Sequence, residues 1–244
     1  MPDPFEAAEY LPLPALSPYV RTDRYERPKE VFKSVADKLR RETDPARAYR
    51  YADVGCANGE LIHHLRGQFP DWSFDGFDLT PEFIETARAY PPLVGVGLHV
   101  KDLYTIEERF EIVTMITVLT ALGEPEEPFD KLLSLVEPGG LLLVDGCFNE
   151  YDVEFRAVFM DNSKPESRGK WRRDYSQHSR RTIARLLEGR CRSFDFEPLP
   201  MIDLPRRPGA PHTDVWTFRD EHGRVITTNG THLMLEKSLL TVRV

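Results

Sequence analysis

Short apolar runs alternate with amphipathic stretches through the first 150 residues of the chain. The apolar runs predict strands over residues 49–54, 72–77, 94–100, 112–118 and 141–144. Helical spacing of apolar residues predicts helices over residues 59–68, 81–89 and 129–136. Strands and helices in this alternating order favour a doubly wound α/β core built around a parallel sheet.

A further helix is expected before the first of these strands. Val31, Val35 and Leu39 recur at helical spacing, and Pro28 suits a first helical turn. This helix should end near Thr43. The first 25 residues hold five prolines and several aromatic residues, which predicts an ordered arm lying on a surface.

The alternation stops after residue 146. Residues 148–175 have no clean strand period and many charges, so we interpret them as an insertion over the carboxyl edge of the sheet. Either Ser176 or Ser179 is expected to cap the next helix. The rest of the pattern predicts a helix, a strand, a hairpin and a closing strand, over residues 176–187, 190–196, 216–228 and 239–244.

These elements divide the chain into four segments. We expect an N-terminal arm and helix, a core, a lid insertion, and C-terminal elements that belong to the same domain as the core. Their bounds are residues 1–47, 48–147, 148–178 and 179–244.

Composition excludes several classes of protein. The chain has 244 residues, of which 41% are hydrophobic and 30% charged, as in soluble globular proteins and unlike collagen-like or wholly disordered ones. Its longest apolar run, residues 112–122, is shorter than the ~20 residues of a membrane helix, and its first residues lack the pattern of a secretory signal. We therefore expect a cytoplasmic protein with no membrane partner. Three scattered cysteines predict free thiols rather than a disulfide framework.

The distribution of charge indicates two kinds of ligand. The net charge of −8 argues against a nucleic acid as partner, because such binding depends on basic residues that neutralise phosphates. Residues 1–150 hold 15 basic and 27 acidic residues, whereas residues 151–244 hold 17 basic and 13 acidic ones. We expect the two parts to face different ligands.

A tight loop lies between the first core strand and its helix. Small residues at Gly55, Ala57 and Gly59 let the backbone turn sharply. A dinucleotide-binding loop would place its third glycine at position 60, which is Glu60. Asp53, just before the loop, would repel a pyrophosphate and attract a ligand with ammonium and sulfonium groups. Both residues disfavour an NAD(P)-dependent oxidoreductase.

The segment 51–60 resembles motif I of the class I S-adenosylmethionine (SAM) dependent methyltransferases, and further positions follow in the family's order. Asp78 stands where the family's second strand presents an acid to the ribose hydroxyls. Asp102 and Leu103 match the pair that holds the adenine. Residues 110–122 and 135–144 are similar to the family's fourth strand and to the start of its fifth. Ala57 and Glu111 depart from the family pattern, which commonly has glycine and aspartate there.

The resemblance covers residues 48–146 and implies a fold and a cofactor. The fold is a Rossmann-like, doubly wound, mainly parallel seven-stranded sheet whose last strand is antiparallel. The cofactor is SAM, released as S-adenosylhomocysteine, and we expect no metal because no His, Cys, Asp and Glu set has metal-ligand spacing. The resemblance places the cofactor against Asp53, Gly55, Cys56, Ala57, Gly59, Asp78, Leu79, Asp102, Leu103 and Thr117.

The acceptor is expected beside a basic segment, residues 168–181, which holds six basic residues and one acid. Arginine binds carboxylate or phosphate through a bidentate fork, so this segment predicts an anion clamp in which aromatic residues alternate with the charges. The alternative is a solvated helix face. The candidate acceptor-binding residues are Trp171, Arg172, Arg173, Arg180 and Arg181.

His178, Tyr175 and His212 are the candidate catalytic residues, with His178 the best proton acceptor of the segment. A histidine that caps the following helix is the alternative for His178. We predict O- or N-methylation of a small, anionic metabolite, sugar or natural-product intermediate, as in methyltransferases of bacterial surface-glycan or secondary-metabolite pathways, which the chain resembles more loosely. A SAM-binding protein without catalysis is the alternative. The oligomeric state is open, and a homodimer fits the sequence as well as a monomer.

Overall fold

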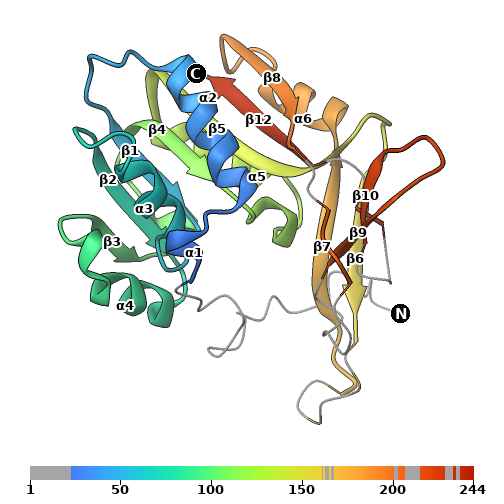
Figure 1. Ribbon diagram of the computed structural model, residues 1–244. Helices are drawn as coiled ribbons and strands as arrows, with labels where there is room; N and C mark the ends of the chain where they lie inside the picture. Colours follow the sequence, from blue (N-terminus) through green and yellow to red (C-terminus); the bar gives the residue numbers. More distant parts are fainter. Residues whose placement is uncertain are drawn as a thin grey trace.

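The computed structural model describes residues 23–160, 162, 165, 168–200, 203–206, 215–228, 233–234 and 237–244. Most of these residues belong to one large sheet and the helices that cover it (Figure 1). A second, smaller sheet within the described residues has three strands. No helix within the described residues is long and apolar enough to cross a membrane.

The large sheet has a main path of seven strands in the order β3-β2-β1-β4-β5-β12-β8. The first five strands pair in parallel, and β12 is antiparallel to both β5 and β8, which confirms the predicted sheet. In chain order the bounds are β1 (Arg50–Val54), β2 (Ser73–Asp78), β3 (Gly97–Val100), β4 (Phe110–Met115), β5 (Val136–Asn149), β8 (Ser193–Pro198) and β12 (Lys237–Arg243).

Helices cover both faces of this sheet. Residues of α2, α3 and α4 share one buried cluster with Tyr51 and Ile112, whereas residues of α5 and α6 share a second cluster with Ala52 and Val113. Because side chains alternate along a strand, consecutive residues of β1 and β4 serve opposite faces. The helices are α1 (Asp23–Glu26), α2 (Glu30–Glu42), α3 (Glu60–Arg66), α4 (Pro81–Ala89), α5 (Glu126–Leu135) and α6 (Arg180–Leu187).

Several predicted bounds in the core are shifted. The third strand begins only at Gly97 because residues 91–93 form a 3-10 turn, η1 (Pro91–Leu93). The fourth strand ends at Met115 rather than at residue 118, since Thr117 has a φ of +62° and leaves the extended conformation. The fifth strand begins at Val136, before the predicted residue 141, and its pairing with β4 shifts register between Phe110 and Ile112.

The segment 148–175, in which the sequence shows no clean strand period, nevertheless contains strands. β6 (Phe155–Phe159) and β7 (Arg172–Ser179) form an antiparallel ribbon that projects from the sheet (Figure 1). β7 also pairs in parallel with the end of β5, Phe148 opposite His178. The sequence of β7 is polar, so its strand conformation follows from this pairing rather than from an apolar period.

The end of β7 also corrects the predicted helix over residues 176–187. Residues 176–179 are the last of β7, and α6 begins at Arg180. Of the two candidate caps, Ser179 is the one used: its Oγ accepts a hydrogen bond from Arg181 N at 3.1 Å. The strand predicted over residues 190–196 corresponds to β8, which begins and ends a few residues later, at Ser193–Pro198.

The predicted hairpin and closing strand are present. β9 (Trp216–Arg219) and β10 (Val225–Thr228) pair in antiparallel register, and β11 (Leu233–Met234) adds a third strand to this small sheet. β12 corresponds to the closing strand. Of the predicted arm, residues 1–22 lie outside the described residues, and the part that follows them forms the short helix α1.

Candidate cofactor and acceptor site

The loop after β1 is hydrogen-bonded to the end of β2. Gly55 N and Cys56 N both donate to the carbonyl of Phe77, at 2.8 and 3.0 Å. Gly55 and Gly59 have φ values of +77° and +80°, in the left-handed region that favours glycine. A Cβ atom at Gly55 would lie 2.3 Å from Val118 Cγ2. The close approach that requires this glycine is therefore to the turn after β4, and a larger residue there would disturb the fold as well as a ligand.

Ala57 occupies the left-handed region without being glycine, with a φ of +48°. The family pattern commonly has glycine at this place, and the structure gives the reason, since an L side chain adopts this conformation at a cost of about 1 kcal/mol or more. The backbone N–H of Ala57 points to the carboxylate of Asp78 and donates to Oδ2 at 2.9 Å. The unusual conformation thus joins the loop to the end of β2.

Asp78 is held by two backbone donors. Besides the bond from Ala57, Thr80 N donates to Oδ1 at 2.8 Å. Each carboxylate oxygen keeps a free lone pair, and the side chain is partly exposed. The pair of oxygens is therefore oriented in advance for two further donors, as the adjacent hydroxyls of a ribose would provide.

Asp102 lies next to Asp78 along the edge of the sheet. β2 and β3 pair up to Asp78 and Val100, and Lys101 N donates to the carbonyl of Asp78 at 3.0 Å. Asp102 begins a 3-10 turn, η2 (Leu103–Thr105), and its Oδ1 accepts from Tyr104 N at 2.9 Å. Both carboxylates therefore follow adjacent strands at the carboxyl edge. Leu79 and Leu103, which the sequence analysis placed beside them, are exposed and half-buried respectively.

Asp53 lies beneath the loop rather than on its surface. Its side chain is 3% exposed, and its Oδ1 accepts from Thr114 Oγ1 at 2.8 Å. Burial raises the pKa of this carboxyl to about 7, although the hydrogen bond from Thr114 opposes the rise. Burial likewise raises the pKa of the Cys56 thiol well above its usual value, so Cys56 is uncharged at neutral pH.

Thr117 marks the end of β4, beside the same edge. Its side chain is exposed, and its backbone N–H donates to Asp145 Oδ1 in β5. Asp145 is 1% exposed and is not among the site residues predicted from the sequence. A signal for it existed, because an acid directly after the apolar run 141–144 interrupts a buried strand.

The end of β7 brings a histidine and a carboxylate together. His178 is 2% exposed, and its Nδ1 lies 2.8 Å from Glu154 Oε2. Glu154 Oε1 accepts from Ser179 N at 3.0 Å. Burial acts to raise the pKa of Glu154, but hydrogen bonds from Thr182, Ser179 and His178 outweigh it and the pKa is lowered. Nothing in the local sequence indicated Glu154, since it meets His178 only through the β6–β7 pairing.

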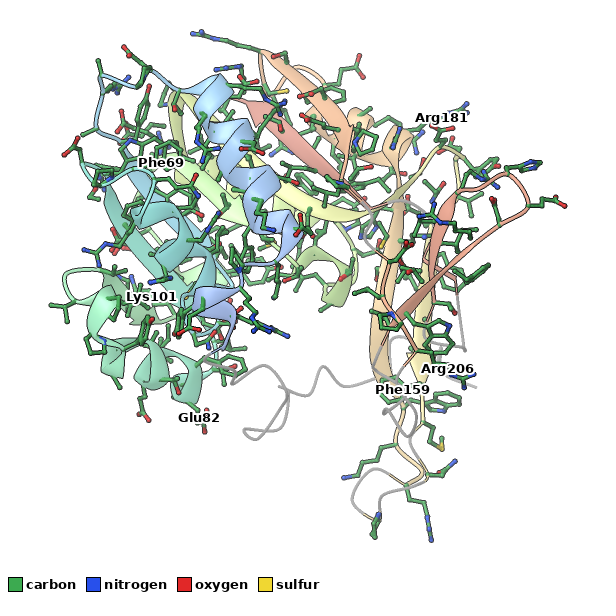
Figure 2. The ribbon with its side chains drawn as sticks, in the orientation of Figure 1. Phe69, Glu82, Lys101, Phe159, Arg181 and Arg206 are labelled. Carbon is green, nitrogen blue, oxygen red and sulfur yellow. The ribbon has the colours of Figure 1, made fainter. Side chains whose placement is uncertain are left out.

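The structure separates the predicted acceptor-binding residues. Arg180 is half-buried: its guanidinium lies 3.4 Å from Glu150 Oε1, donates to Ser238 Oγ at 3.0 Å, and stacks over the ring of Phe196. Arg181 is exposed at the periphery of the molecule (Figure 2). Trp171 is 43% exposed.

Other candidates are described only in part. Arg172, Arg173 and Tyr175 belong to the backbone of β7, and their side chains lie outside what the structure describes. His212 lies outside the described residues altogether. Within the described part of the chain, no three His, Cys, Asp or Glu side chains are grouped so as to hold a metal ion.

A contact from α1 to the loop was absent from the sequence analysis. Tyr25 Oη donates to the carbonyl of Asn58 at 2.6 Å, and its ring stacks on Tyr90 at 3.8 Å between centroids. Glu60, which stands where a dinucleotide loop would have its third glycine, is 5% exposed and lies 3.7 Å from Arg24 and 3.8 Å from Lys29. α1 and the start of α2 therefore cover the loop, and Glu60 ties them to it.

Comparison with known proteins agrees with this geometry. Residues 52–142 match a protein family described as a methyltransferase domain. The chain is 32% identical over 101 residues to trans-aconitate 2-methyltransferase of Methylobacterium radiotolerans, a match that covers 41% of this chain and 39% of that protein. It is 30% identical over 94 residues to malonyl-[acyl-carrier protein] O-methyltransferase of Hahella chejuensis, covering 37% and 34%. The match thus covers less than half the length of each of these two relatives.

Solved structures share the fold over most of the chain. The SAM-bound amino pentose methyltransferase from Micromonospora echinaspora has a TM-score of 0.54 and 16% identity, covering 97% of this chain and all of that one. The SAM-bound magnesium protoporphyrin IX methyltransferase from Synechocystis has a TM-score of 0.51 and 16% identity, covering 88% and 79%. At this level of identity the likeness concerns the fold.

Proposed function

We propose that this chain, whose residues 52–142 match a methyltransferase domain, is a class I SAM-dependent methyltransferase and that it methylates a small, anionic metabolite. The observation that supports this best is the carboxylate of Asp78, oriented by Ala57 N and Thr80 N beside Asp102. Such acceptor groups suit ribose hydroxyls and an exocyclic amine. The loop with left-handed Gly55 and Gly59 brings its backbone close to the Asp78 carboxylate.

The residues present fit SAM. We propose that Asp78 holds its ribose, that Asp102 and Leu103 hold its adenine, and that Asp53 faces its ammonium group beneath the loop. Bound there, SAM supplies a methyl group activated by its sulfonium. The protein's own contribution is to align the acceptor with that group and to exclude water from it.

An anionic acceptor fits the residues beyond β5. Arg180 is the one described arginine of the basic segment that is half-buried beside β12 and β8, so we propose it as the residue that holds the acceptor's anionic group. Two relatives are named for trans-aconitate and malonyl-[acyl-carrier protein], which both carry carboxylates. Turnover of SAM with a panel of carboxylic acids tests the activity, and binding of SAM without turnover would favour a non-catalytic protein.

The first prediction concerns Asp78. Asp78→Ala should weaken binding of S-adenosylhomocysteine by roughly 5- to 150-fold, since leaving buried polar groups without their charged partner costs ~1–3 kcal/mol. Isothermal titration calorimetry measures the change. Asp71→Ala is the control, because Asp71 is exposed just before the same strand. Equal affinity of the Asp78 variant and the parent protein would remove Asp78 from the site.

A further inference from the structure

We propose that His178 and Glu154 form a proton-accepting pair at the methyl-transfer site, and that the acceptor atom therefore carries a proton, as a hydroxyl or an ammonium group does. This inference rests on the proposed function and narrows its substrate class. On this proposal the acceptor has two different groups: an anionic group that the protein binds, and a second, protonated group that is methylated.

The contact with Glu154 determines which nitrogen of His178 is basic. An ionised carboxylate only accepts hydrogen bonds, so Nδ1 must carry the hydrogen in the 2.8 Å contact with Glu154 Oε2. In the neutral ring the lone pair is then on Nε2. The pKa of Glu154 is lowered, against the effect of its burial, by hydrogen bonds from Thr182, Ser179 N and His178, which keeps the carboxylate ionised and the tautomer constant.

Nε2 of His178 is buried and has no hydrogen-bond partner among the described residues. The whole side chain is 2% exposed, so the solvent that would satisfy an exposed ring nitrogen has little access to it. A buried polar atom without a partner costs ~1–3 kcal/mol, so a ligand that provides a partner is favoured. A proton donor on a bound acceptor would satisfy this nitrogen.

The position of His178 in the fold is suitable. His178 pairs with Phe148 at the carboxyl end of β5, and β7 packs against the turn η3 (Leu119–Ala121), which follows β4. The loop with Gly55 and Gly59 follows β1, the neighbour of β4 in the sheet. The cofactor-binding residues and His178 thus follow strand ends along one edge of the sheet, the former at β1, β2 and β3 and the latter beside β5.

The chemistry explains why such a pair implies a protonated nucleophile. A hydroxyl oxygen forms a bond to the methyl carbon while the carbon–sulfur bond breaks and its electron pair stays on sulfur. An ammonium nitrogen does the same only after it has lost a proton, because until then it has no lone pair. The proton of the acceptor atom passes to Nε2 of His178 and from there to solvent. A carboxylate oxygen has no proton to lose at neutral pH, so its methylation gains nothing from a base.

Glu154 acts through His178 and is therefore a positioning residue. One of its oxygens holds Nδ1–H, and the other accepts from Ser179 N, the cap of α6. The ring is thus fixed to the start of a helix. Glu154→Gln keeps a carbonyl acceptor for Ser179 N, while its amide group can donate to Nδ1 and so move the ring hydrogen to Nε2.

The first test reads the tautomer directly and needs no acceptor. Nitrogen-15 NMR of the full-length protein, saturated with S-adenosylhomocysteine, should show His178 protonated at Nδ1 and unprotonated at Nε2. Glu154→Gln should shift this signal toward the Nε2-protonated form. A ring that carries its hydrogen on Nε2, or on both nitrogens, in the parent protein at neutral pH would overturn the proposal.

The second test compares acceptors. Methyl transfer from labelled SAM is measured to malate and salicylate, which carry hydroxyls, and to succinate and benzoate, which carry only carboxylates. The proposal expects transfer to a hydroxyl, with His178→Ala lowering kcat by about 100- to 10,000-fold and Glu154→Gln lowering it by at least about tenfold. Transfer to carboxylates alone, or equal kcat values in all variants, would overturn it.

Control variants separate this proposal from the proposed function. His222→Gln and Glu221→Gln alter an exposed His–Glu pair in the hairpin turn and should leave kcat unchanged. S-adenosylhomocysteine should bind the His178 and Glu154 variants within about twofold of the parent protein. Failure of the parent protein to bind S-adenosylhomocysteine or SAM contradicts the proposed function itself, whereas normal binding with the wrong tautomer contradicts only the role of His178.

Discussion

At the scale of single residues, Asp53 is a buried acid whose charge lowers the stability of the folded protein and is proposed to bind the ammonium group of SAM. It is an acid at 3% exposure whose described hydrogen-bond donor is the hydroxyl of Thr114, itself in contact with Tyr51 Oη at 2.5 Å. Burial raises its pKa from 3.8 to about 7. A charge on Asp53 is therefore unfavourable in the folded protein until a cation lies beside it, which is the role we propose for the ammonium of SAM.

The second prediction follows from this raised pKa. The unfolded chain loses the Asp53 proton near pH 3.8, whereas the folded protein holds it to about pH 7. The folded state binds more protons across this window, so the free energy of unfolding falls as pH rises through it. Asp53→Asn has no proton to lose, so its free energy of unfolding should not fall in this way. Relative to the parent protein, the free energy of unfolding of the variant should therefore be higher at pH 8 than at pH 4.5 by about 2 to 4 kcal/mol.

Urea unfolding of both proteins at the two pH values, without SAM, measures this difference. The same variant should bind S-adenosylhomocysteine more weakly, because a neutral amide replaces the partner proposed for the ammonium group. A difference in stability that is equal at pH 4.5 and pH 8 would show that Asp53 has an ordinary pKa in the folded protein.

At the scale of elements, the short helix α1 supports the cofactor loop. Four residues are too few to form a stable helix alone, so α1 depends on its contacts with α3 and the loop. Tyr25 makes three contacts: it donates to the carbonyl of Asn58, stacks on Tyr90 and meets the ring of His63 edge-on. Burial raises the pKa of the Tyr25 hydroxyl, which stays protonated as a donor.

The third prediction is that Tyr25→Phe lowers the free energy of unfolding by about 1 to 2 kcal/mol, since it keeps the ring contacts and leaves the carbonyl of Asn58 without its donor. Binding of S-adenosylhomocysteine should also weaken, because this carbonyl belongs to the loop. Urea unfolding and calorimetry measure the two effects. Tyr151→Phe is the control, with a side chain 71% exposed and an expected change within about 0.5 kcal/mol. An unchanged Tyr25 variant would mean that α1 contributes little to the loop.

At the scale of the whole molecule, the beginning and the end of the described chain are joined by ion pairs. Lys38 in α2 has a side chain 7% exposed and lies 3.1 Å from Asp195 and 3.2 Å from Glu197, both in β8. Arg41 donates to Glu197, and Arg243 of β12 contacts Glu42. Because β12 and β8 complete the sheet on the side of β5, these contacts fix α2 across strands that come last in sequence.

The fourth prediction concerns this connection. Lys38→Met preserves the packing of the buried stem and removes the charge, and it should lower the free energy of unfolding by about 1 to 3 kcal/mol. Lys33→Met is the control, since Lys33 forms an exposed pair with Glu30 that should contribute less than about 0.5 kcal/mol. Thermal or urea unfolding measures both. Equal effects of the two substitutions would show that the buried position of Lys38 gives its ion pairs no added strength.

The sequence by itself determined the alternation of strands and helices, the mixed seven-stranded sheet through its resemblance to a family, and the acids at the ends of the first three strands. These features depend on short stretches: apolar period, turn residues and left-handed positions such as Gly55 are local properties. Strand β7 escaped prediction because its sequence is polar, and the ribbon is stabilised by pairing of β6 with β7 and of β7 with β5.

Only the tertiary structure decided which distant residues meet. Glu154 reaches His178, Tyr25 reaches Asn58 and Lys38 reaches Asp195 across 24, 33 and 157 positions of the chain. The sequence also presented Asp53 as a charged acid, whereas burial beside Thr114 makes its ionisation costly. Contact and burial depend on how separate elements pack. Residue type and spacing along the chain therefore indicate which chemical groups a site contains, but not which side chains meet or which of them are protonated.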